Sequence, residues 1–388
     1  MTATEELPAV RAMLTAIAAE NGELPEPWAA AMAAVRRHEF LPQVLWRWDG
    51  DHYVPIDAGK QPDRWRAAAY APTSVVTQVN DGRPVEAGTE VFPSSSASAP
   101  AVVARMLGTL DPGPGQRVLE IGTGTGWNAA LLAHVIGAGN VTSLEVDAEV
   151  AEQAATTLER LAPGVKVVVG DGTFGAPDGA PYDHVMATCS LNRLPATLLR
   201  QTRPGGTILT PWSRPWCNYG LLHLTVRDDG SAQGRFHPYA DFMPARGQRL
   251  DLRIYRDVVR DDHQPDESRT TLPPDAVAGD DFAAQFALAL RLPDLWYAWH
   301  EAPAVDGVVR RLWVATVDAG SWAAVDETET GGGTFTVWQH GPRKLWDEVA
   351  AAWDRYVAHG RPGPDRFGMT VSADGFHEAW LDSPANRI

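Results

Sequence analysis

Three glycines at alternate positions, Gly122, Gly124 and Gly126, have the spacing in this chain that most clearly suggests chemistry. They follow the apolar residues 118–121 and precede a run of helix formers that starts at Ala129. A strand, a glycine turn and a helix form the first half of a nucleotide-binding unit, in which glycine lets the backbone approach a ligand closely. A purely structural turn is the alternative, because the run departs from the dinucleotide pattern at its third glycine.

Acidic residues near three predicted strand ends indicate which kind of ligand the site would bind. Glu120 stands just before the turn, where it would repel a pyrophosphate but suit a cation such as S-adenosylmethionine, with its sulfonium and ammonium groups. Glu145 lies roughly twenty residues beyond the turn, the spacing at which a carboxylate binds ribose hydroxyls. Asp171 ends a third strand and could accept a hydrogen bond from an adenine amino group, although aspartate is also common in turns. Together they favour a site for S-adenosylmethionine.

A serine-rich stretch, residues 92–100, precedes the glycine turn. Such runs are usually flexible linkers, or they place a residue such as Ser98 as the N-cap of the helix expected over 101–110. The functional interpretation is that hydroxyl and backbone N–H groups here meet a carboxylate, because helix starts attract anions. These physical arguments leave both interpretations open.

The elements that must position these residues alternate between strand and helix. Strands are expected at 118–121, 140–146, 166–169, 182–187 and 207–211, with helices from 129, at 148–161 and at 194–201. This alternation predicts an α/β fold with a Rossmann-like parallel sheet, whose ligands bind at the carboxyl ends of the strands. Further strands at 221–226 and 252–256 would extend the sheet. An N-terminal cap is expected from helices at 7–20 and 28–37, an irregular loop with short strand pieces at 46–70 and a strand at 74–79.

The C-terminal part predicts an extra α+β module. Strands are expected at 312–317 and 334–338, a helix at 345–357, and a closing hairpin from 369–372 and 379–381. We therefore divide the chain into a cap (1–90), a central α/β domain that holds the predicted ligand site (91–258) and an accessory C-terminal module (259–388). More than half of the 15 tryptophans follow residue 290, which suggests an aromatic surface, although core packing is the alternative for any one of them.

Composition excludes several functions. A net charge of −16 argues against a nucleic-acid partner, which would require a basic face. Cys189 and Cys217 are too few for a disulfide framework, and we find no metal-ligand cluster. There is no signal-peptide pattern and no apolar run long enough to span a membrane. We expect a cytoplasmic monomer.

Three motifs together resemble the protein-L-isoaspartate O-methyltransferase family, and they read VLEIGTGTGWNAALLA, VVVGDGTFGAPDGAPYDHVMAT and LRQTRPGGTILTPW. The step from Ser98 to Pro100 is similar to the family's serine–x–proline signature, and residues 34–42 are similar to the end of its N-terminal helix. The resemblance implies that Ser98 holds the substrate carboxylate and that Ser96 lines the same pocket. It implies S-adenosylmethionine as cofactor, S-adenosylhomocysteine as product, and these cofactor-binding residues: Glu120, Gly122, Thr123, Gly124, Gly126, Glu145, Val146, Asp171, Gly172 and Thr188.

The resemblance also implies the type of acceptor. In this family it is a side-chain carboxylate, which is ionised at neutral pH and requires no general base, so that catalysis is mostly positioning. Repair enzymes of the family end near the last strands of the sheet, whereas this chain runs about 160 residues further. It is similar to extended methyltransferases that esterify an ordinary L-aspartate in a modified, ribosomally made peptide, giving a succinimide (aspartimide) that can open to isoaspartate. We expect that activity on a modified precursor peptide. Isoaspartyl repair is the alternative, and an idle peptide-binding protein is the third possibility.

Overall fold

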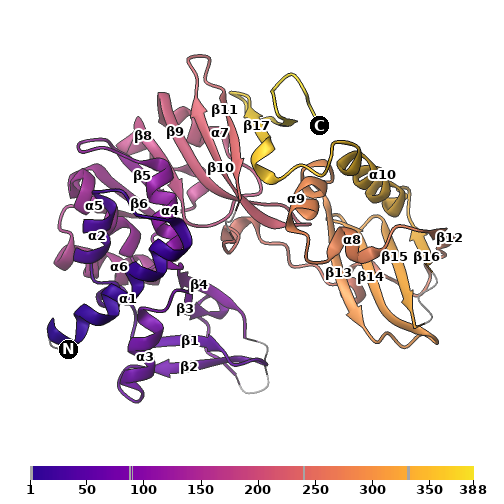
Figure 1. The fold of residues 1–388 in the computed structure, drawn as a ribbon, viewed down its shortest axis with the longest axis horizontal. Helices are drawn as coiled ribbons and strands as arrows, with labels where there is room; N and C mark the ends of the chain where they lie inside the picture. Colours follow the sequence, from indigo (N-terminus) through magenta and orange to yellow (C-terminus); the bar gives the residue numbers. More distant parts are fainter. Residues whose placement is uncertain (1–2, 87–88, 90, 239–240, 330–332) are drawn as a thin grey trace.

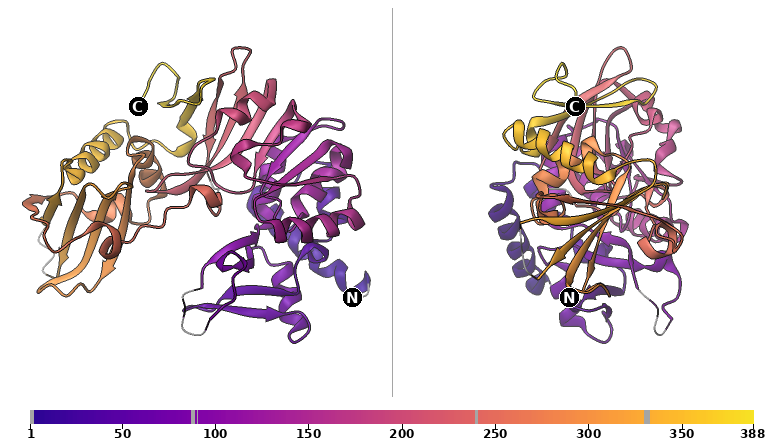
Figure 2. Two further views of the ribbon diagram at one scale, coloured as in Figure 1. Left: turned by 180° about the vertical axis from the view of Figure 1, so that it is seen from behind. Right: turned by 90° about the vertical axis from the view of Figure 1, so that its right-hand side faces the viewer.

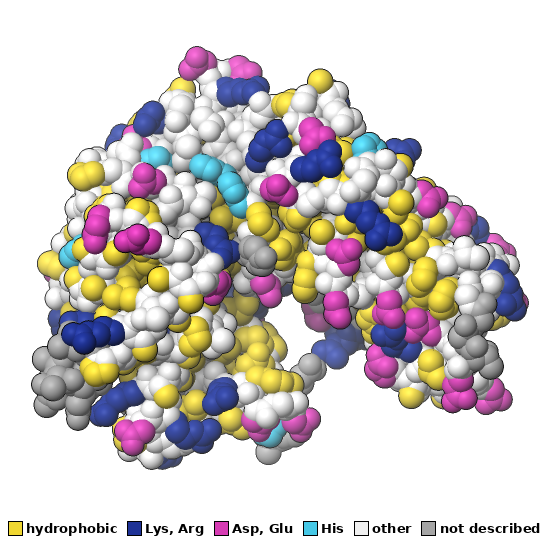
Figure 3. Space-filling model, viewed as in Figure 1, with side chains coloured by type: hydrophobic (Ala, Val, Ile, Leu, Met, Phe, Trp, Pro, Cys, Tyr) yellow, Lys and Arg dark blue, Asp and Glu magenta, His cyan; other side chains and the backbone are white. Residues whose placement is uncertain are grey.

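The computed structural model describes residues 3–86, 89, 91–238, 241–329 and 333–388, and their strands form three sheets. A nine-stranded sheet occupies the middle of an arch, with a four-stranded sheet below one end and a five-stranded sheet below the other (Figure 1). The views in Figure 2 show the same arrangement from behind and from the side. The surface is deeply notched between the two smaller sheets, and acidic side chains gather on the lobe formed by the five-stranded sheet (Figure 3).

The nine-stranded sheet contains the predicted parallel strands. In spatial order its members are β18 (His377–Leu381), β17 (Phe367–Val371), β11 (Ala232–His237), β10 (Asn218–Val226), β9 (Thr202–Ser213), β8 (Tyr182–Ala187), β5 (Val118–Ile121), β6 (Val141–Glu145) and β7 (Lys166–Val169). The five strands from β9 to β7 are parallel, and the other four add on in antiparallel fashion. The predicted α/β fold is confirmed.

One predicted strand of this sheet is wrong. Residues 252–256 do not extend it, because Ile254–Val258 forms a π-helical turn. Ile254 and Val258 stand four positions apart and are both buried against an aromatic cluster that contains Trp313 and Trp322. The apolar spacing is therefore used by a helical turn rather than by a strand.

Helix α4 (Pro100–Leu110) leads into the first parallel strand, and three helices connect later ones: α5 (Trp127–Ile136), α6 (Ala148–Leu161) and α7 (Ala196–Gln201). Helix α5 begins two residues before the predicted start, with Gly126 as its N-cap at φ +85°. The Ser98 N-cap is wrong, because Ala99 precedes α4, makes no side-chain cap, and is followed by Pro100 at the first helical position. The serine run is also not a linker, since residues 93–97 form strand β4 (Pro93–Ala97).

The N-terminal part is more ordered than its sequence suggests. Helices α1 (Ala3–Asn21) and α2 (Trp28–Ala34) and the 3-10 turn η1 (Arg37–Phe40) precede a four-stranded sheet of β2 (Tyr53–Asp57), β1 (Val44–Trp48), β3 (Val75–Val79) and β4. Residues 46–70, expected to be loop with short strand pieces, hold most of the β1–β2 hairpin, and they also hold helix α3 (Pro62–Ala69), which was not predicted. Leu45 and Ile56 are fully buried partners across that hairpin, so tertiary packing stabilises strands that lack a clean apolar period.

The C-terminal part has a five-stranded sheet: β12 (Asp266–Thr270), β16 (Phe335–His340), β15 (Trp322–Thr328), β14 (Val308–Thr316) and β13 (Leu295–Glu301). Helices α8 (Pro274–Ala278), α9 (Phe282–Arg291) and α10 (Leu345–Ala358) accompany it. The strands expected at 312–317 and 334–338 and the helix at 345–357 are confirmed. Trp296, Trp313, Trp322 and Trp346 are buried, which favours core packing for these four.

The closing hairpin forms as predicted but in a different place. Strand β17 pairs with β11, so the hairpin completes the large sheet instead of the C-terminal one. The range 259–388 thus contains strands of two sheets, and the division at residues 90 and 258 stays a prediction. No helix in the described part of the chain has the length and apolar character needed to cross a membrane.

Candidate active site

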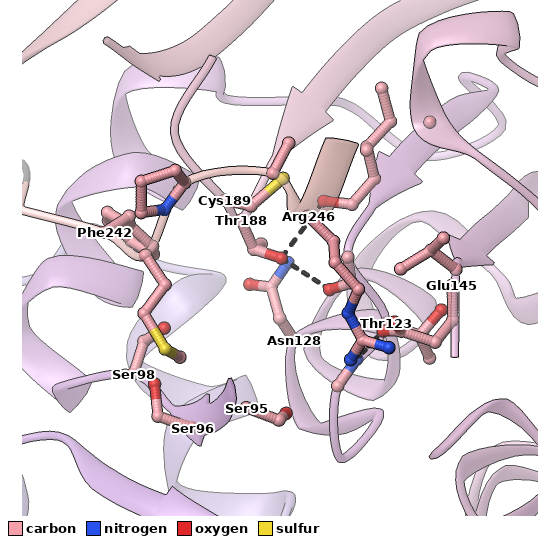
Figure 4. A pocket seen from close by; sticks show the side chains of 18 of the residues that line it. Ser95, Ser96, Ser98, Thr123, Asn128, Glu145, Thr188, Cys189, Phe242 and Arg246 are labelled. Carbon is pink, nitrogen blue, oxygen red and sulfur yellow. Dashed lines mark hydrogen bonds between the residues drawn. The ribbon is translucent and has the colours of Figure 1, made fainter. Parts of the chain in front are cut away.

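A cavity of about 440 Å³ lies where β5, β6, β7 and β8 end. Its walls come from the strand ends, the glycine turn, strand β4 and residues 241–249, which we call the strap. Figure 4 shows Ser96 of β4 and the nearby Ser98 on the opposite side of the cavity from Glu145. The structure brings ten of the twelve predicted residues into this lining: Ser96, Ser98, Gly122, Thr123, Gly124, Glu145, Val146, Asp171, Gly172 and Thr188. Glu120 and Gly126 lie outside it.

The glycine turn has a backbone that other residues rarely adopt. Gly122 and Gly124 have φ of +95° and +52°. A Cβ on Gly122 would lie 2.7 Å from Thr188 Oγ1, which donates hydrogen bonds to the carbonyl oxygens of Ile121 and Gly122. A Cβ on Gly172 would overlap the side chain of Ile121. These positions leave no room for a side chain, so the backbone itself forms this wall of the cavity.

Two carboxylates stand at the ends of neighbouring strands. Glu145 is almost buried, and its Oε2 accepts a hydrogen bond of 2.9 Å from the Gly124 amide. Asp171 Oδ1 accepts bonds of 2.8 Å from both the amide and the hydroxyl of Thr173. A Cβ on Gly247 of the strap would lie 3.6 Å from Asp171 Oδ2, so the strap passes directly beside this carboxylate. Both acids therefore face the cavity from a fixed position.

Glu120 lies beneath the cavity rather than in it. The side chain is fully buried, Asn128 Nδ2 donates to its Oε1 at 2.7 Å, and Ser143 Oγ donates to its Oε2. Burial raises the pKa of Glu120 to about 7, although these two hydrogen bonds work in the opposite direction. Ser143 also pairs with the Thr123 hydroxyl at 2.7 Å. The prediction of direct ligand contact by Glu120 is therefore corrected, since its carboxylate is enclosed by its own hydrogen-bond partners and supports two residues that do line the cavity.

Asn128 was missed by sequence reasoning and presents a polar atom that lacks a partner. It lines the cavity, and its Oδ1 is buried without a hydrogen bond among the described residues. A buried acceptor of this kind requires a donor, which the ammonium group of S-adenosylmethionine could supply. With Glu145 and Asp171 as acceptors for ribose and adenine, and the glycine turn as a cradle, the cavity fits this cofactor. The individual roles remain proposals.

The serine side of the cavity is held by a buried arginine. Arg37 is fully buried, and its Nη2 donates to the carbonyl oxygens of Ala97 (3.0 Å) and Ser98 (2.9 Å), while Nη1 donates to that of Ala69 (2.7 Å). Its guanidinium lies 5.5 Å from the ring centroid of Trp127. Burial lowers the pKa of Arg37 to about 10, so it stays charged at neutral pH. Arg37 thus fixes the backbone at Ser98, and no local sequence signal shows this role.

The strap closes another side of the cavity. It is tied to the residues after β8 by hydrogen bonds between the Ser190 amide and Met243 O (3.0 Å) and between the Ala245 amide and Ser190 O (2.9 Å). Arg246 and Arg249 line the cavity and reach acidic partners, with Arg246 Nη1 3.1 Å from Asp147 and Arg249 Nη1 2.7 Å from Asp81. Sequence reasoning missed this segment because its residues carry no motif.

Cys189 also lines the cavity but is unsuited to nucleophilic attack. Burial, followed by the nearby carboxylates of Glu145 and Asp171, raises the pKa of its thiol to about 12. The thiolate is the reactive form of cysteine, and it is scarce at neutral pH under these conditions. The arrangement instead suits direct transfer between two bound groups.

Comparisons with known proteins agree with this geometry. The family model described as protein-L-isoaspartate(D-aspartate) O-methyltransferase matches residues 63–249. Two relatives named protein-L-isoaspartate O-methyltransferase are those of Pyrococcus horikoshii, 38% identical over 171 residues (44% of this chain and 74% of the relative), and of Methanopyrus kandleri, 34% identical over 224 residues (57% and 83%). A solved structure of that name shares the fold at 20% identity and a TM-score of 0.55, covering 96% of this chain and all of its own.

The identity and length of these two matches are sufficient to assign the chain to a family as well as to a fold. Each of these relatives is at least 30% identical, and this chain covers more than two thirds of its length. The expected enzyme class and cofactor are confirmed: the protein is a carboxyl O-methyltransferase that uses S-adenosylmethionine. The extended peptide-tailoring group is not supported by these relatives. The chain belongs to the protein-L-isoaspartate O-methyltransferase family.

Proposed function

We propose that the protein methylates the side-chain carboxylate of isoaspartyl residues in damaged proteins and peptides. The observation that carries the proposal is the meeting of Ser96 and Ser98 with the cofactor half of one cavity. The names of the relatives support the isoaspartyl form of the substrate. The alternative that we drew from the sequence is thus better supported than our main expectation.

In this reaction the protein side chains bind and orient the substrate carboxylate. S-adenosylmethionine, when bound, supplies the methyl group for the ionised carboxylate and is left as S-adenosylhomocysteine. Ser98 holds the carboxylate, with its backbone kept in place by Arg37. Ser96 lines the same pocket. No side chain has to remove a proton, because a carboxylate is already ionised at neutral pH. Catalysis then depends on how the carboxylate and the cofactor are oriented within the cavity.

The second candidate is methylation of an L-aspartyl residue in a modified precursor peptide. It is favoured by the C-terminal part, since the family model ends at residue 249 and β12 to β16 lie beyond it. The support is weaker than it was from the sequence. A solved structure named protein-L-isoaspartate O-methyltransferase aligns with 96% of this chain, so the extension does not by itself separate the chain from proteins of that name.

A matched peptide pair tests the proposal. Two peptides of one sequence, differing only in an isoaspartyl or L-aspartyl linkage, are incubated with the enzyme and methyl-labelled cofactor. We expect base-labile label in the isoaspartyl peptide alone. Label in a cyclised precursor or in the L-aspartyl peptide, with none in the isoaspartyl peptide, would favour the second candidate. If cofactor binds by calorimetry but neither peptide is labelled, both proposals fail.

A further inference from the structure

Two arginines that have no acidic partner within the described part of the chain lie near the active site. Arg214 follows strand β9, and its guanidinium lies 5.0 Å from the ring centroid of Trp212, which is buried. The Nε atom of Arg214 is buried and has no hydrogen-bond partner among the described residues. Leaving a charged donor unpaired is costly, because the group has lost water without gaining an acceptor. The site therefore lacks one hydrogen-bond acceptor.

A second arginine, Arg193, adds positive charge next to Arg214. Arg193 is exposed, and its loop is bonded to the end of β9, because the Leu191 amide donates to Pro211 O (3.0 Å) and Leu191 O accepts from the Ser213 amide (3.1 Å). Burial first, and then the charge of Arg193, lower the pKa of Arg214 to about 10. Among the residues that the structure describes, neither guanidinium has an ion pair with a carboxylate. Two like charges repel at short range, so this pair is unfavourable until an anion joins it. This is notable in a chain of net charge −16.

His377 completes the cluster without neutralising it. Its Nε2 accepts a hydrogen bond of 3.0 Å from the Leu194 amide, and its ring centroid lies 5.7 Å from that of Trp212. Burial first, and then Arg214 and Arg193, lower the pKa of His377 to about 4. The imidazole is therefore neutral at physiological pH. It orders the loop that carries Arg193 and leaves the charge of the two arginines uncompensated.

The cluster lies within reach of a bound polypeptide. Leu191 lines the active-site cavity, and Arg193 follows two positions later, so their Cα atoms are at most about 7 Å apart. The strap contacts the same loop, because Gln248 Nε2 donates to the Arg193 carbonyl at 3.2 Å. Phe376, next to His377, is 66% exposed and offers an apolar neighbour.

We infer that Arg193 and Arg214 form a subsite for an acidic side chain of the polypeptide substrate, close in sequence to the methylated residue. The inference rests on the proposed function and adds to it, because it assigns the enzyme a preference for acidic sequence context. A carboxylate of the substrate accepts hydrogen bonds from both guanidinium groups, which satisfies the buried Nε of Arg214 and removes the repulsion within the pair. The two arginines bind substrate and take no part in methyl transfer.

The test compares two isoaspartyl peptides, one with glutamates and one with glutamines on both sides of the isoaspartyl residue. For the native enzyme we expect a KM about tenfold lower for the glutamate peptide, with the same kcat, as one charge-assisted contact provides. Arg214→Gln and, separately, Arg193→Gln should raise the KM of the glutamate peptide to that of the glutamine peptide. Arg200→Gln is the matched control, because Arg200 is exposed on the neighbouring helix α7 and its removal changes the net charge equally.

The outcomes separate this inference from the proposed function. If neither peptide is methylated, the proposed function fails, and anisotropy of the dye-labelled peptides still measures whether Arg214→Gln weakens binding of the glutamate peptide. Equal KM values for both peptides in the native enzyme would overturn the subsite. The subsite would also be overturned if Arg193→Gln raised the KM of both peptides equally. This variant is expected to fold, because Arg193 lies in an exposed loop. Calorimetry with inorganic phosphate tests whether the ligand is a free anion. If phosphate binds the native enzyme but not Arg214→Gln, and the two peptides have equal KM values, the site binds that anion instead of the substrate.

Discussion

The two halves of the cavity are built in different ways. The half that fits the cofactor comes from β5, β6 and β7, which are consecutive in the chain and end side by side. The half that fits the carboxylate combines β4 with Arg37, which lies far away in sequence, and the strap runs along both halves and passes beside Asp171. The first is a repeated strand–turn–helix pattern in which each loop carries its own ligand group. The second depends on tertiary contacts, so a change in one of its segments affects the others.

This difference predicts which substitutions damage the framework and which damage a single contact. In the carboxylate half, a supporting residue such as Arg37 should matter more than the serine it supports. In the cofactor half, replacing one ligand group should weaken binding and leave the fold intact. Four measurements, ordered by expected effect, can break or refine this contrast.

Arg37→Met should have the largest effect. It would leave the carbonyl oxygens of Ala69, Ala97 and Ser98 buried without their donor. At about 1 to 3 kcal/mol for each unsatisfied group, the free energy of unfolding should fall by about 3 kcal/mol or more. Urea denaturation measures it, with Arg47→Met on the exposed side of β1 as the control. A loss below about 1 kcal/mol would show that the serine strand does not depend on this guanidinium.

Sequence reasoning predicted most of the cofactor half, and in the other half it predicted Ser96 and Ser98 but not the residues that support them, for a physical reason. Gly122, Gly124 and Asp171 are recognisable because local backbone geometry demands their residue types. Arg37 acts over sixty residues on Ser98, and its role appears only when tertiary structure buries it. Asn128 looks like any helical asparagine until the unpaired Oδ1 is seen at the cavity wall.

The same limit explains the errors in the fold. The parallel strands were predicted because buried strands separated by helices have a clear apolar pattern. The β1–β2 hairpin was missed because its strands are stabilised by partners such as Leu45 and Ile56 across the pair. The closing hairpin was predicted from its own residues, but its pairing with β11 joins segments more than 130 residues apart. Local patterns specify elements better than they specify neighbours.

Glu120→Gln should change how stability depends on pH. The pKa of Glu120 is raised from 4.5 to about 7 in the folded protein, so the folded state binds more protons than the unfolded state between these values. Stability from this group is therefore present at pH 4.5 and lost as the pH rises to about 7, by about 3 kcal/mol at most. Chemical denaturation at pH 5 and pH 8 should show that the variant loses less stability than the native protein. Glu159→Gln, on the exposed face of α6, is the control, and parallel pH profiles for Glu120→Gln and the native protein would contradict the buried ionisable state.

Ser98→Ala and Asp171→Asn should each affect one half of the cavity only. We expect a change of about tenfold in each case, in kcat/KM for the first variant and in cofactor affinity for the second. Ser98→Ala removes the hydroxyl proposed to hold the carboxylate, so kcat/KM for the isoaspartyl peptide should fall while the cofactor dissociation constant stays constant. Asp171→Asn keeps an oxygen for the two bonds from Thr173 but replaces the other acceptor, so cofactor affinity should fall and kcat at saturating cofactor should not. Calorimetry and steady-state kinetics measure both. Weaker cofactor binding in Ser98→Ala would show that the two halves are not independent.

Arg249→Gln should have the smallest effect and should depend on salt. Arg249 Nη1 lies 2.7 Å from Asp81, and about a quarter of each side chain is exposed, so the pair is partly screened by water. Such a pair contributes at most about 1 kcal/mol, which limits the rise in peptide KM to about fivefold at low ionic strength. In 1 M salt the difference from the native enzyme should vanish, because charges are screened within about 3 Å. Arg269→Gln, on exposed strand β12, controls for net charge. A loss of kcat that does not depend on salt would instead mean that the strap fixes the geometry of the reacting groups. The strap would then have the same structural role as Arg37.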